Sequence, residues 1–239
     1  MNQARIDILH EDENLLVLNK PADLVCHPTK GDEYSSLVSR VRLHLGPDAE
    51  SHLINRLDRE TTGVVMVTKN LESAREWRKL WESREVQKTY LAIVHGWVVE
   101  ERRTLDLPLG KDEQSPVAIK DCVRDGGSLA TTRFVRLRQF RRADRRFTLL
   151  EVSPQSGRKH QIRIHLAHIG HPIVGDKIYG GDERIYLDFV EGHLSEEQRA
   201  RLILTNHALH AQRLTAEWRG RSWEFEAPLS EEFERFLEG

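Results

Sequence analysis

Two pairs of strand-like segments, each joined by a short polar turn, constrain the fold of this chain most. ATTRFVRLRQF (130–140) and FTLLEVS (147–153) flank RRADRR, and LHAQRLTAEW (209–218) and SWEFEA (222–227) flank Arg219-Gly220-Arg221. Strands joined this closely pair antiparallel, because a parallel connection needs a crossover of a dozen or more residues. The chain is therefore not a regular alternation of parallel strands and helices.

The remaining segments add both strands and helices in an irregular order. Strands are expected at NLLVLN (14–19), VVMVT (64–68) and VQKTYLAIVHGWVV (86–99), which are rich in β-branched residues. Helices are expected at 35–45, after an Asn70 cap, at 158–170, after a Ser195 capping box, and after Ser230. This order predicts an α+β fold with a mixed, largely antiparallel central sheet flanked by helices. No composition shift marks a linker, so we expect a single domain over residues 1–239.

Composition narrows the setting in which the chain works. No apolar run approaches the roughly 20 residues that span a bilayer, and the N-terminus has no secretory pattern. Cys26 and Cys122 are isolated, which is more typical of reduced thiols than of a disulfide framework. We therefore expect a cytoplasmic protein.

Charge is distributed unevenly along the chain. The net charge is −2, yet RFVRLRQFRRADRR (133–146) holds seven arginines against one aspartate. Like charges this close repel one another, and an anionic partner such as RNA would relieve the repulsion. A solvated hairpin is the alternative. The residues expected to contact RNA here are Arg133, Arg141, Arg142, Arg145 and Arg146.

A carboxylate lies between two guanidinium groups in NRLDRETTG (55–63), just before a buried strand. If Arg56 and Arg59 face Asp58, they favour its ionised form and lower its pKa. Such a carboxylate is suited to act as a nucleophile or an electrostatic anchor. The alternative is a loop aspartate that caps a turn and pairs with Arg59 in water.

HQIRIHLAHIGH (160–171) combines four histidines with an arginine. A metal site is conceivable, but no HExxH pattern or acid at ligand spacing accompanies the histidines. Arg163 lies between two isoleucines, so partial burial would require a carboxylate or phosphate partner; a solvent-facing side chain is the alternative. Tyr90 lies within an expected strand, where packing is the usual role of tyrosine.

Several common catalytic motifs are missing from the sequence. It contains no GxxxxGK[ST] loop, no GxGxxG after a strand, no GxSxG and no CxxC. These absences favour chemistry that uses no cofactor.

Six stretches, taken together and in order, resemble the RluA-type pseudouridine synthases. They are NLLVLNKPADLVCHP, NRLDRETTGVVMVTK, QKTYLAIVHG, ATTRFV, SGRKHQIRIHLAHIGHPIVGDKIYG and LHAQRL. The resemblance covers the chain from about residue 10 to residue 228. The resemblance implies a pseudouridine synthase fold with a central RNA-binding cleft, here as the catalytic domain without an S4 domain. It also implies the isomerisation of specific uridines in structured RNA, without cofactor or metal, by a protein expected to be monomeric.

The same resemblance assigns roles to individual residues. Asp58 corresponds to the catalytic aspartate, Arg163 to the arginine that pairs with it, and Tyr90 to the active-site tyrosine that stacks on the target base. Arg56 corresponds to a position that contacts the RNA and helps hold the surroundings of the displaced nucleotide. Whether the aspartate first engages the ribose C1′ or the base C6 is left open, as is the choice between ribosomal and transfer RNA.

Two residues depart from the family pattern. Asn55 replaces a histidine that often precedes the RLD sequence, and Asp23 replaces a glycine that often follows Lys-Pro. These departures affect how the substrate fits. Two other functions remain as alternatives: a non-catalytic RNA-binding module, and a metal-dependent hydrolase built on the histidine-rich helix.

Overall fold

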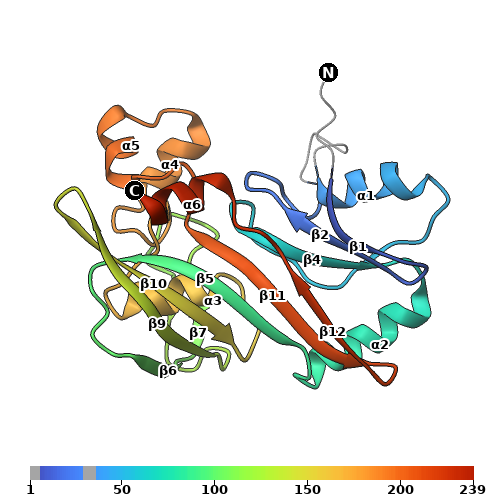
Figure 1. Ribbon diagram of the computed structural model, residues 1–239. Coiled ribbons are helices and arrows are strands. Elements are labelled where there is room, and N and C mark those ends of the chain that lie inside the picture. The colour runs from blue at the N-terminus through green and yellow to red at the C-terminus, as the bar shows by residue number, and fades with distance from the viewer. Residues whose placement is uncertain (1–5, 29–35) are drawn as a thin grey trace. The chain divides into compact units, whose positions relative to one another are not determined.

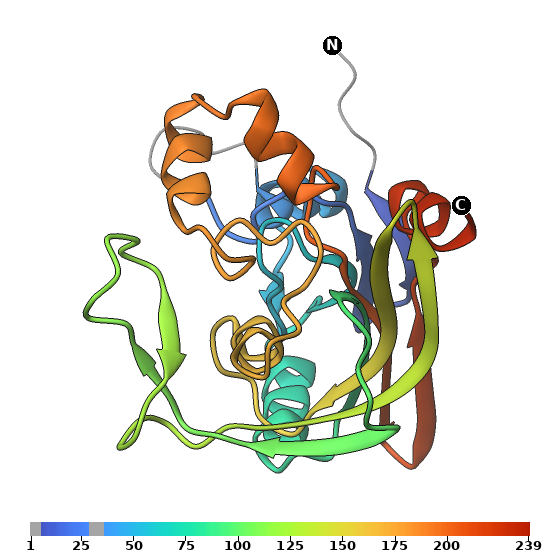
Figure 2. The same cartoon turned by 90° about the vertical axis from the view of Figure 1, so that its left-hand side faces the viewer.

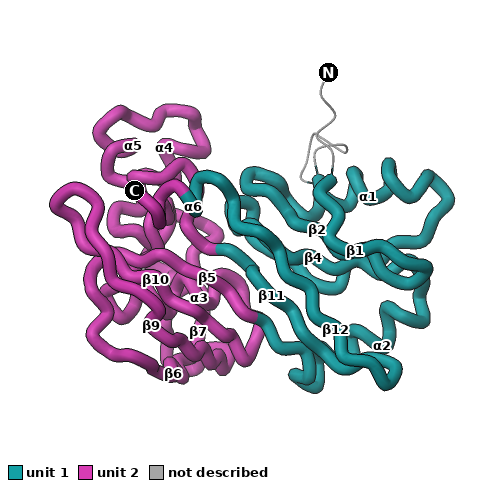
Figure 3. The backbone as a smooth tube through the Cα atoms, viewed as in Figure 1, with its two compact units in different colours: residues 1–88, 210–234 teal, residues 89–209, 235–239 magenta. Residues whose placement is uncertain are grey.

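The computed structural model describes residues 6–28 and 36–239 (Figure 1). The chain divides into two compact units: unit 1 comprises residues 1–88 and 210–234, and unit 2 comprises residues 89–209 and 235–239 (Figure 3). The boundaries fall inside strand β5 (Gln87–His95), strand β11 (Leu209–Trp218) and helix α6 (Glu231–Glu238). Each unit contains its own paired strands. The expectation of a single domain over residues 1–239 stays a prediction.

Unit 1 is built around β4 (Thr62–Thr68), in which every residue is buried. β4 pairs antiparallel with β2 (Leu15–Lys20) and with the short β3 (His52–Leu53), and β2 pairs antiparallel with β1 (Asp7–Glu11). β11 pairs antiparallel with β12 (Arg221–Glu226), whereas β4 and β11 run parallel where they meet. Parallel and antiparallel pairs thus occur together, as predicted.

The core of unit 1 lies between these strands and α2 (Leu71–Glu82). Asn70 caps α2 as predicted, because its side-chain oxygen accepts a hydrogen bond from the Ser73 amide at 2.9 Å. Trp77 of α2 is fully buried and packs against Trp218 of β11, with ring centroids 5.5 Å apart. The second helix of this unit, α1 (Leu37–Leu45), begins after Ser36; position 35 of the predicted segment lies outside the described residues.

Unit 2 contains an antiparallel sheet in the order β5, β10 (Arg145–Pro154), β9 (Thr131–Arg142) and β6 (Arg102–Asp106). β9 and β10 form the predicted hairpin, with a bulge where Leu149 and Leu150 pair with Arg138 and Arg136. β7 (Leu109–Lys111) and β8 (Asp121–Val123) form a separate two-stranded sheet, the green hairpin of Figure 2.

Three helices complete unit 2. They are α3 (Gln161–His168), α4 (Arg184–Glu191) and α5 (Glu196–Leu202). The α5 capping box at Ser195 and Gln198 is confirmed. α3 starts later than position 158, because His160 before it has a left-handed backbone with φ of 54°.

The predicted α+β fold with a mixed sheet is confirmed, and the longest predicted strand is shorter than expected. β5 ends at His95 because Gly96, at φ of 82°, turns the chain out of the strand. Several short elements were not predicted, namely β1, β3, β6, β7, β8 and α4. Strands of two to five residues carry too little hydrophobic pattern to be recognised without their partners.

Candidate active site

A side-chain amide fastens the loop that carries Asp58 to the edge of β4. The amide nitrogen of Asn55 donates to the carbonyl of Val64 at 3.0 Å, and its oxygen accepts from the N–H of Met66 at 2.8 Å. Asn55 is 8% exposed, so both bonds are shielded from water. The amide offers one donor and one acceptor, as a peptide group of a neighbouring strand would. Asn55, one of the two residues that depart from the family pattern, therefore has a structural role.

The side chain of Lys20 also holds the loop that carries Asp58. It is fully buried, and its Nζ donates to the carbonyls of Pro21 at 2.8 Å, Leu24 at 2.9 Å and Arg59 at 2.9 Å. Burial lowers the pKa of Lys20 to about 8, although the charges of Cys26 and Asp58 nearby act in the opposite direction. A buried ammonium next to Asp58 was not anticipated from the sequence.

Asp58 lies half-buried within this loop, and its carbonyl accepts a hydrogen bond from the Thr61 amide at 3.2 Å. Arg59 is exposed, and its Nε lies 3.5 Å from a carboxylate oxygen of Asp23, the second departure. Arg56 is exposed as well. Asp23 thus supplies a surface partner for one of the two arginines that flank Asp58.

The start of β4 is bonded to β11 through a buried histidine. Thr62 Oγ1 and His210 Nδ1 lie 2.7 Å apart, and His210 Nε2 lies 3.1 Å from the carbonyl oxygen of Ala227. Because a carbonyl only accepts, Nε2 carries the proton and Nδ1 accepts from the threonine hydroxyl. Burial lowers the pKa of His210, which favours this neutral form.

In unit 2, Arg163 on α3 forms a buried bidentate ion pair with Asp176. Arg163 Nε donates to Asp176 Oδ2 at 2.7 Å, and Nη2 donates to Oδ1 at 2.9 Å. Arg163 is 5% exposed and Asp176 is 2% exposed. Although burial alone would raise the pKa of Asp176, the Arg163 guanidinium holds it well below its ordinary value. The sequence predicts a carboxylate or phosphate partner for a buried Arg163 but does not identify Asp176, which lies in the GDKIYG stretch.

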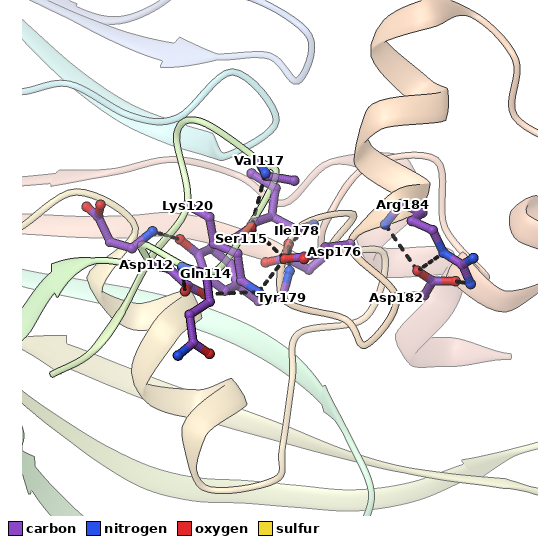
Figure 4. Close-up of polar contacts among 12 residues, drawn as sticks. Asp112, Gln114, Ser115, Val117, Lys120, Asp176, Ile178, Tyr179, Asp182 and Arg184 are labelled. Atoms are coloured by element: carbon purple, nitrogen blue, oxygen red, sulfur yellow. Dashed lines mark hydrogen bonds and ion pairs between the residues drawn. The ribbon is translucent and has the colours of Figure 1, made fainter.

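The Asp176 carboxylate is also held by its own backbone. It accepts from the amides of Ile178 at 2.9 Å and Tyr179 at 3.0 Å, as Figure 4 shows. The Tyr179 ring lies under the Arg163 guanidinium, 5.1 Å from centroid to carbon, so it covers the ion pair. Its hydroxyl lies 3.0 Å from His160 Nδ1, and burial raises its pKa. Asp176 and Tyr179 therefore both contribute to the orientation of Arg163.

The histidines of the α3 region make hydrogen bonds within unit 2. His165 Nδ1 lies 2.8 Å from Thr132 Oγ1, and its Nε2 lies 3.0 Å from the carbonyl of Leu107. His171 Nδ1 lies 2.9 Å from the carbonyl of His95. Within residues 6–28 and 36–239, no three His, Cys, Asp or Glu side chains lie close enough together to hold a metal ion.

Tyr90 and the arginine-rich hairpin also lie in unit 2. Tyr90 is half-buried in β5, opposite Val152 of β10. In the hairpin, Arg133 is exposed, whereas Arg142 donates to the carbonyls of Phe236 and Leu237 at the end of α6, at 3.0 Å and 2.5 Å. A cation at a helix C-terminus satisfies carbonyls that have no partner inside the helix.

The predicted site residues are distributed over both units. Asp58 and Arg56 belong to unit 1, and Tyr90, Arg163 and the arginine-rich hairpin belong to unit 2. The pairing of Arg163 with Asp58 therefore stays a prediction.

No helix in the described parts of the chain is long and apolar enough to cross a membrane.

Comparison with known proteins supports the resemblance found in the motifs. The family model for RNA pseudouridylate synthase matches residues 14–168. Ribosomal large subunit pseudouridine synthase D of Pseudomonas aeruginosa is 35% identical over 234 residues, which cover 95% of this chain and 69% of that protein. The RNA pseudouridine synthase YhcT of Bacillus subtilis is 32% identical over 76% of this chain, which spans 60% of YhcT.

A solved structure agrees with these sequence matches. Human RNA pseudouridylate synthase domain containing 4 superposes with a TM-score of 0.73 at 27% identity, covering 97% of this chain and 91% of that one. The buried Arg163–Asp176 pair and the fastened Asp58 loop lie in the stretches on which the RluA-type resemblance rests. The chain is therefore an RNA pseudouridine synthase, a member of the RNA pseudouridylate synthase family of enzymes.

Proposed function

We propose that this enzyme converts specific uridines of large-subunit ribosomal RNA into pseudouridine, with Asp58 as the catalytic residue and without a cofactor. The ribosomal substrate is suggested by the name of the Pseudomonas aeruginosa relative, which matches 95% of this chain. Transfer RNA is the alternative substrate. A cytoplasmic location and a monomeric state belong to the same proposal.

The observation that carries the proposal is the way in which the Asp58 loop is held. Asn55 bonds the loop to β4, and the Lys20 ammonium holds the Arg59 carbonyl one residue after Asp58. A group that reacts at one atom of a substrate must keep its position to within fractions of an ångström. An ordinary surface turn has no need of a buried amide and a buried ammonium.

The proposed chemistry breaks the N1–C1′ bond of the uridine and joins C1′ to C5 of the rotated base, while C5 loses its proton and N1 gains one. The Asp58 carboxylate would act on C1′ or C6, and either role requires its ionised form. Arg163 would supply the opposite charge that favours this form, and Asp176 would keep the guanidinium in place. Tyr90 would stack on the base once it leaves the RNA stack, which costs a few kcal/mol.

RNA would be held outside the reacting base by arginines. Arg56 and Arg133 are exposed, which leaves their guanidinium groups accessible to phosphates. Arg141, Arg142, Arg145 and Arg146, at the tip of the β9–β10 hairpin, complete the proposed RNA-binding set. Neutralising phosphates with a local patch would let a chain of net charge −2 bind a polyanion.

The variant Asp58→Asn tests the catalytic assignment, because it keeps the shape of the side chain and removes its charge. We expect no detectable isomerisation of uridine in ribosomal RNA, with RNA affinity changed by less than about tenfold. Substantial turnover by this variant would contradict the mechanism. Wild-type protein that binds RNA but forms no pseudouridine would instead indicate the non-catalytic binding module.

A further inference from the structure

An exposed tryptophan in unit 2 lies against two arginines of the β9–β10 hairpin. The guanidinium carbon of Arg146 is 4.5 Å from the centroid of the Trp97 ring, and that of Arg141 is 5.2 Å away. Trp97 is 38% exposed, which is unusual for so large an apolar side chain. A partly solvent-facing indole beside two cations is a combination that nucleic-acid-binding surfaces use.

Backbone contacts hold the segment of Trp97 on one face of the hairpin. The Gly96 amide donates to the carbonyl of Arg146 at 2.8 Å, and the Val98 amide donates to Thr148 Oγ1 at 3.1 Å. The side chain of Gln139 donates to the Val98 carbonyl at 2.9 Å. The backbone on both sides of Trp97 is therefore fixed, so less conformational freedom is lost when a ligand binds the ring.

The two faces of the hairpin tip differ in how their arginines are used. Arg141 pairs with Arg146 and Arg142 pairs with Arg145, so each pair shares one face of the ladder. On the face of Arg142, Phe236 of α6 packs on Phe140 and Phe147, and Arg142 donates to α6 carbonyls. The C-terminal end of α6 lies beside this tip in Figure 2. The face with Arg142 thus also stabilises the fold.

The face with Arg141 and Arg146 has no such structural role for its charges. The two residues are directly opposite each other across the ladder, an arrangement in which like charges destabilise a sheet. Neither forms an ion pair with a carboxylate of residues 6–28 or 36–239. An anion placed between them would remove the repulsion.

The side chains of Trp97, Arg141 and Arg146 favour one kind of anionic ligand. Guanidinium groups bind phosphate oxygens through paired hydrogen bonds, and an indole offers a flat surface on which a base can stack. Phosphates alone would be supplied by any duplex or acidic membrane, but only an unpaired nucleotide brings a phosphate and a free base face together.

We propose that Trp97, Arg141 and Arg146 form a platform for a single-stranded segment of the RNA substrate, with the guanidinium groups on successive phosphates and a base stacked on the indole. This deepens the proposed function and rests on it, because RNA is taken to be the substrate. The platform uses no residue assigned to the chemistry.

The test measures the affinity of the full chain for a labelled oligouridylate of about ten nucleotides and for an RNA duplex, at several salt concentrations. Trp97→Leu should weaken binding to the single strand by about tenfold with an unchanged salt slope, since it removes one base stack. Trp97→Phe should keep most of the affinity. Arg141→Gln with Arg146→Gln should flatten the salt slope by about 1.4, the contribution of two single-strand phosphates.

The matched control is Arg199→Gln with Arg201→Gln, which removes the same charge from two exposed positions of α5 outside the proposed RNA-binding set. Its salt slope should stay close to that of the wild type. Equal flattening by both double variants would overturn the platform, since it would mean that only net charge matters.

Two further results would overturn the proposal. One is wild-type affinity for the oligouridylate in Trp97→Leu, and the other is an equal loss of binding to the duplex or to vesicles of anionic phospholipid. Failure of the proposed catalytic function is recognised separately, because it would appear as turnover by Asp58→Asn whatever the Trp97 variants do.

Discussion

Gly63 in β4 and Ala211 in β11 pair in parallel so closely that a Cβ atom at Gly63 would fall on the backbone of Ala211. Gly63 also has φ of 110°, a conformation that residues with a side chain rarely adopt. Glycine is therefore required at position 63, which ends the NRLDRETTG stretch, for two reasons: its φ is positive, and the Ala211 backbone leaves no room for a Cβ atom. It determines how the loop with Asp58 enters the sheet.

Gly63→Ala should lower the free energy of unfolding by about 2 to 6 kcal/mol, the sum of backbone strain and overpacking. Gly46→Ala is the matched control, because Gly46 has φ of 102° and no atom within 4 Å of an added Cβ. It should show the strain alone, about 1 to 3 kcal/mol. Urea denaturation of both variants measures the difference, and equal losses would show that β11 can move away from Gly63.

Asp176→Asn should lower the free energy of unfolding by about 3 to 5 kcal/mol, because it removes the charge of the carboxylate that pairs in bidentate fashion with the buried Arg163 guanidinium. Arg163→Met should cost a similar amount for the converse reason. The double variant should lose less than the sum of the two, since the partners are removed together. Strict additivity in denaturant unfolding would contradict the ion pair. The exposed pair of Asp182 and Arg184 (Figure 4) is the control, and Asp182→Asn should leave the midpoint almost unchanged.

The Arg163–Asp176 ion pair also predicts that the free energy of unfolding decreases at acidic pH. The pKa of Asp176 is lower in the folded than in the unfolded protein, so its contribution is fully present above about pH 4. It is lost as the pH falls further, through the folded pKa. Unfolding curves of the wild type and Asp176→Asn should therefore converge in acid, and parallel curves down to strongly acidic pH would disprove this.

Lys20 predicts a change of stability in alkali. Its pKa is about 8 when folded and 10.5 as its ordinary value, so the unfolded chain binds more protons between these values. The free energy of unfolding contributed by Lys20 should therefore rise with pH across this window. Lys20→Met should lack this rise when both proteins are unfolded in urea from about pH 7 to about pH 9.5. An identical slope in both proteins would mean that the folded and unfolded ammonium groups titrate alike.

Asn55→Leu should disturb the Asp58 loop more than the rest of unit 1. It leaves the Val64 carbonyl and the Met66 amide buried without partners, at about 1 to 3 kcal/mol each. We expect the turnover number for uridine isomerisation to fall more than RNA affinity. Asn19→Leu, which removes an exposed amide bonded to Asp7, is the control and should preserve both. A larger effect on affinity than on turnover would assign Asn55 to RNA binding instead.

The sequence by itself determined the elements that depend on local pattern. The Asn70 cap, the Ser195 capping box and both hairpins are confirmed, because caps and tight turns are encoded within a few consecutive residues. The family was also accessible from sequence, because its motifs place Asp58, Tyr90 and Arg163 in long and specific stretches.

Only the tertiary structure decided which distant residues meet. Asp176 lies 13 positions after Arg163, Lys20 lies 39 positions before the Arg59 carbonyl, and Trp97 lies 44 and 49 positions before its two arginines. No local pattern encodes such contacts, since they arise when strands and loops far apart in sequence pack together. The alternation of faces along β9 and β10 likewise separates Arg141 from Arg142, although the two are adjacent in the chain.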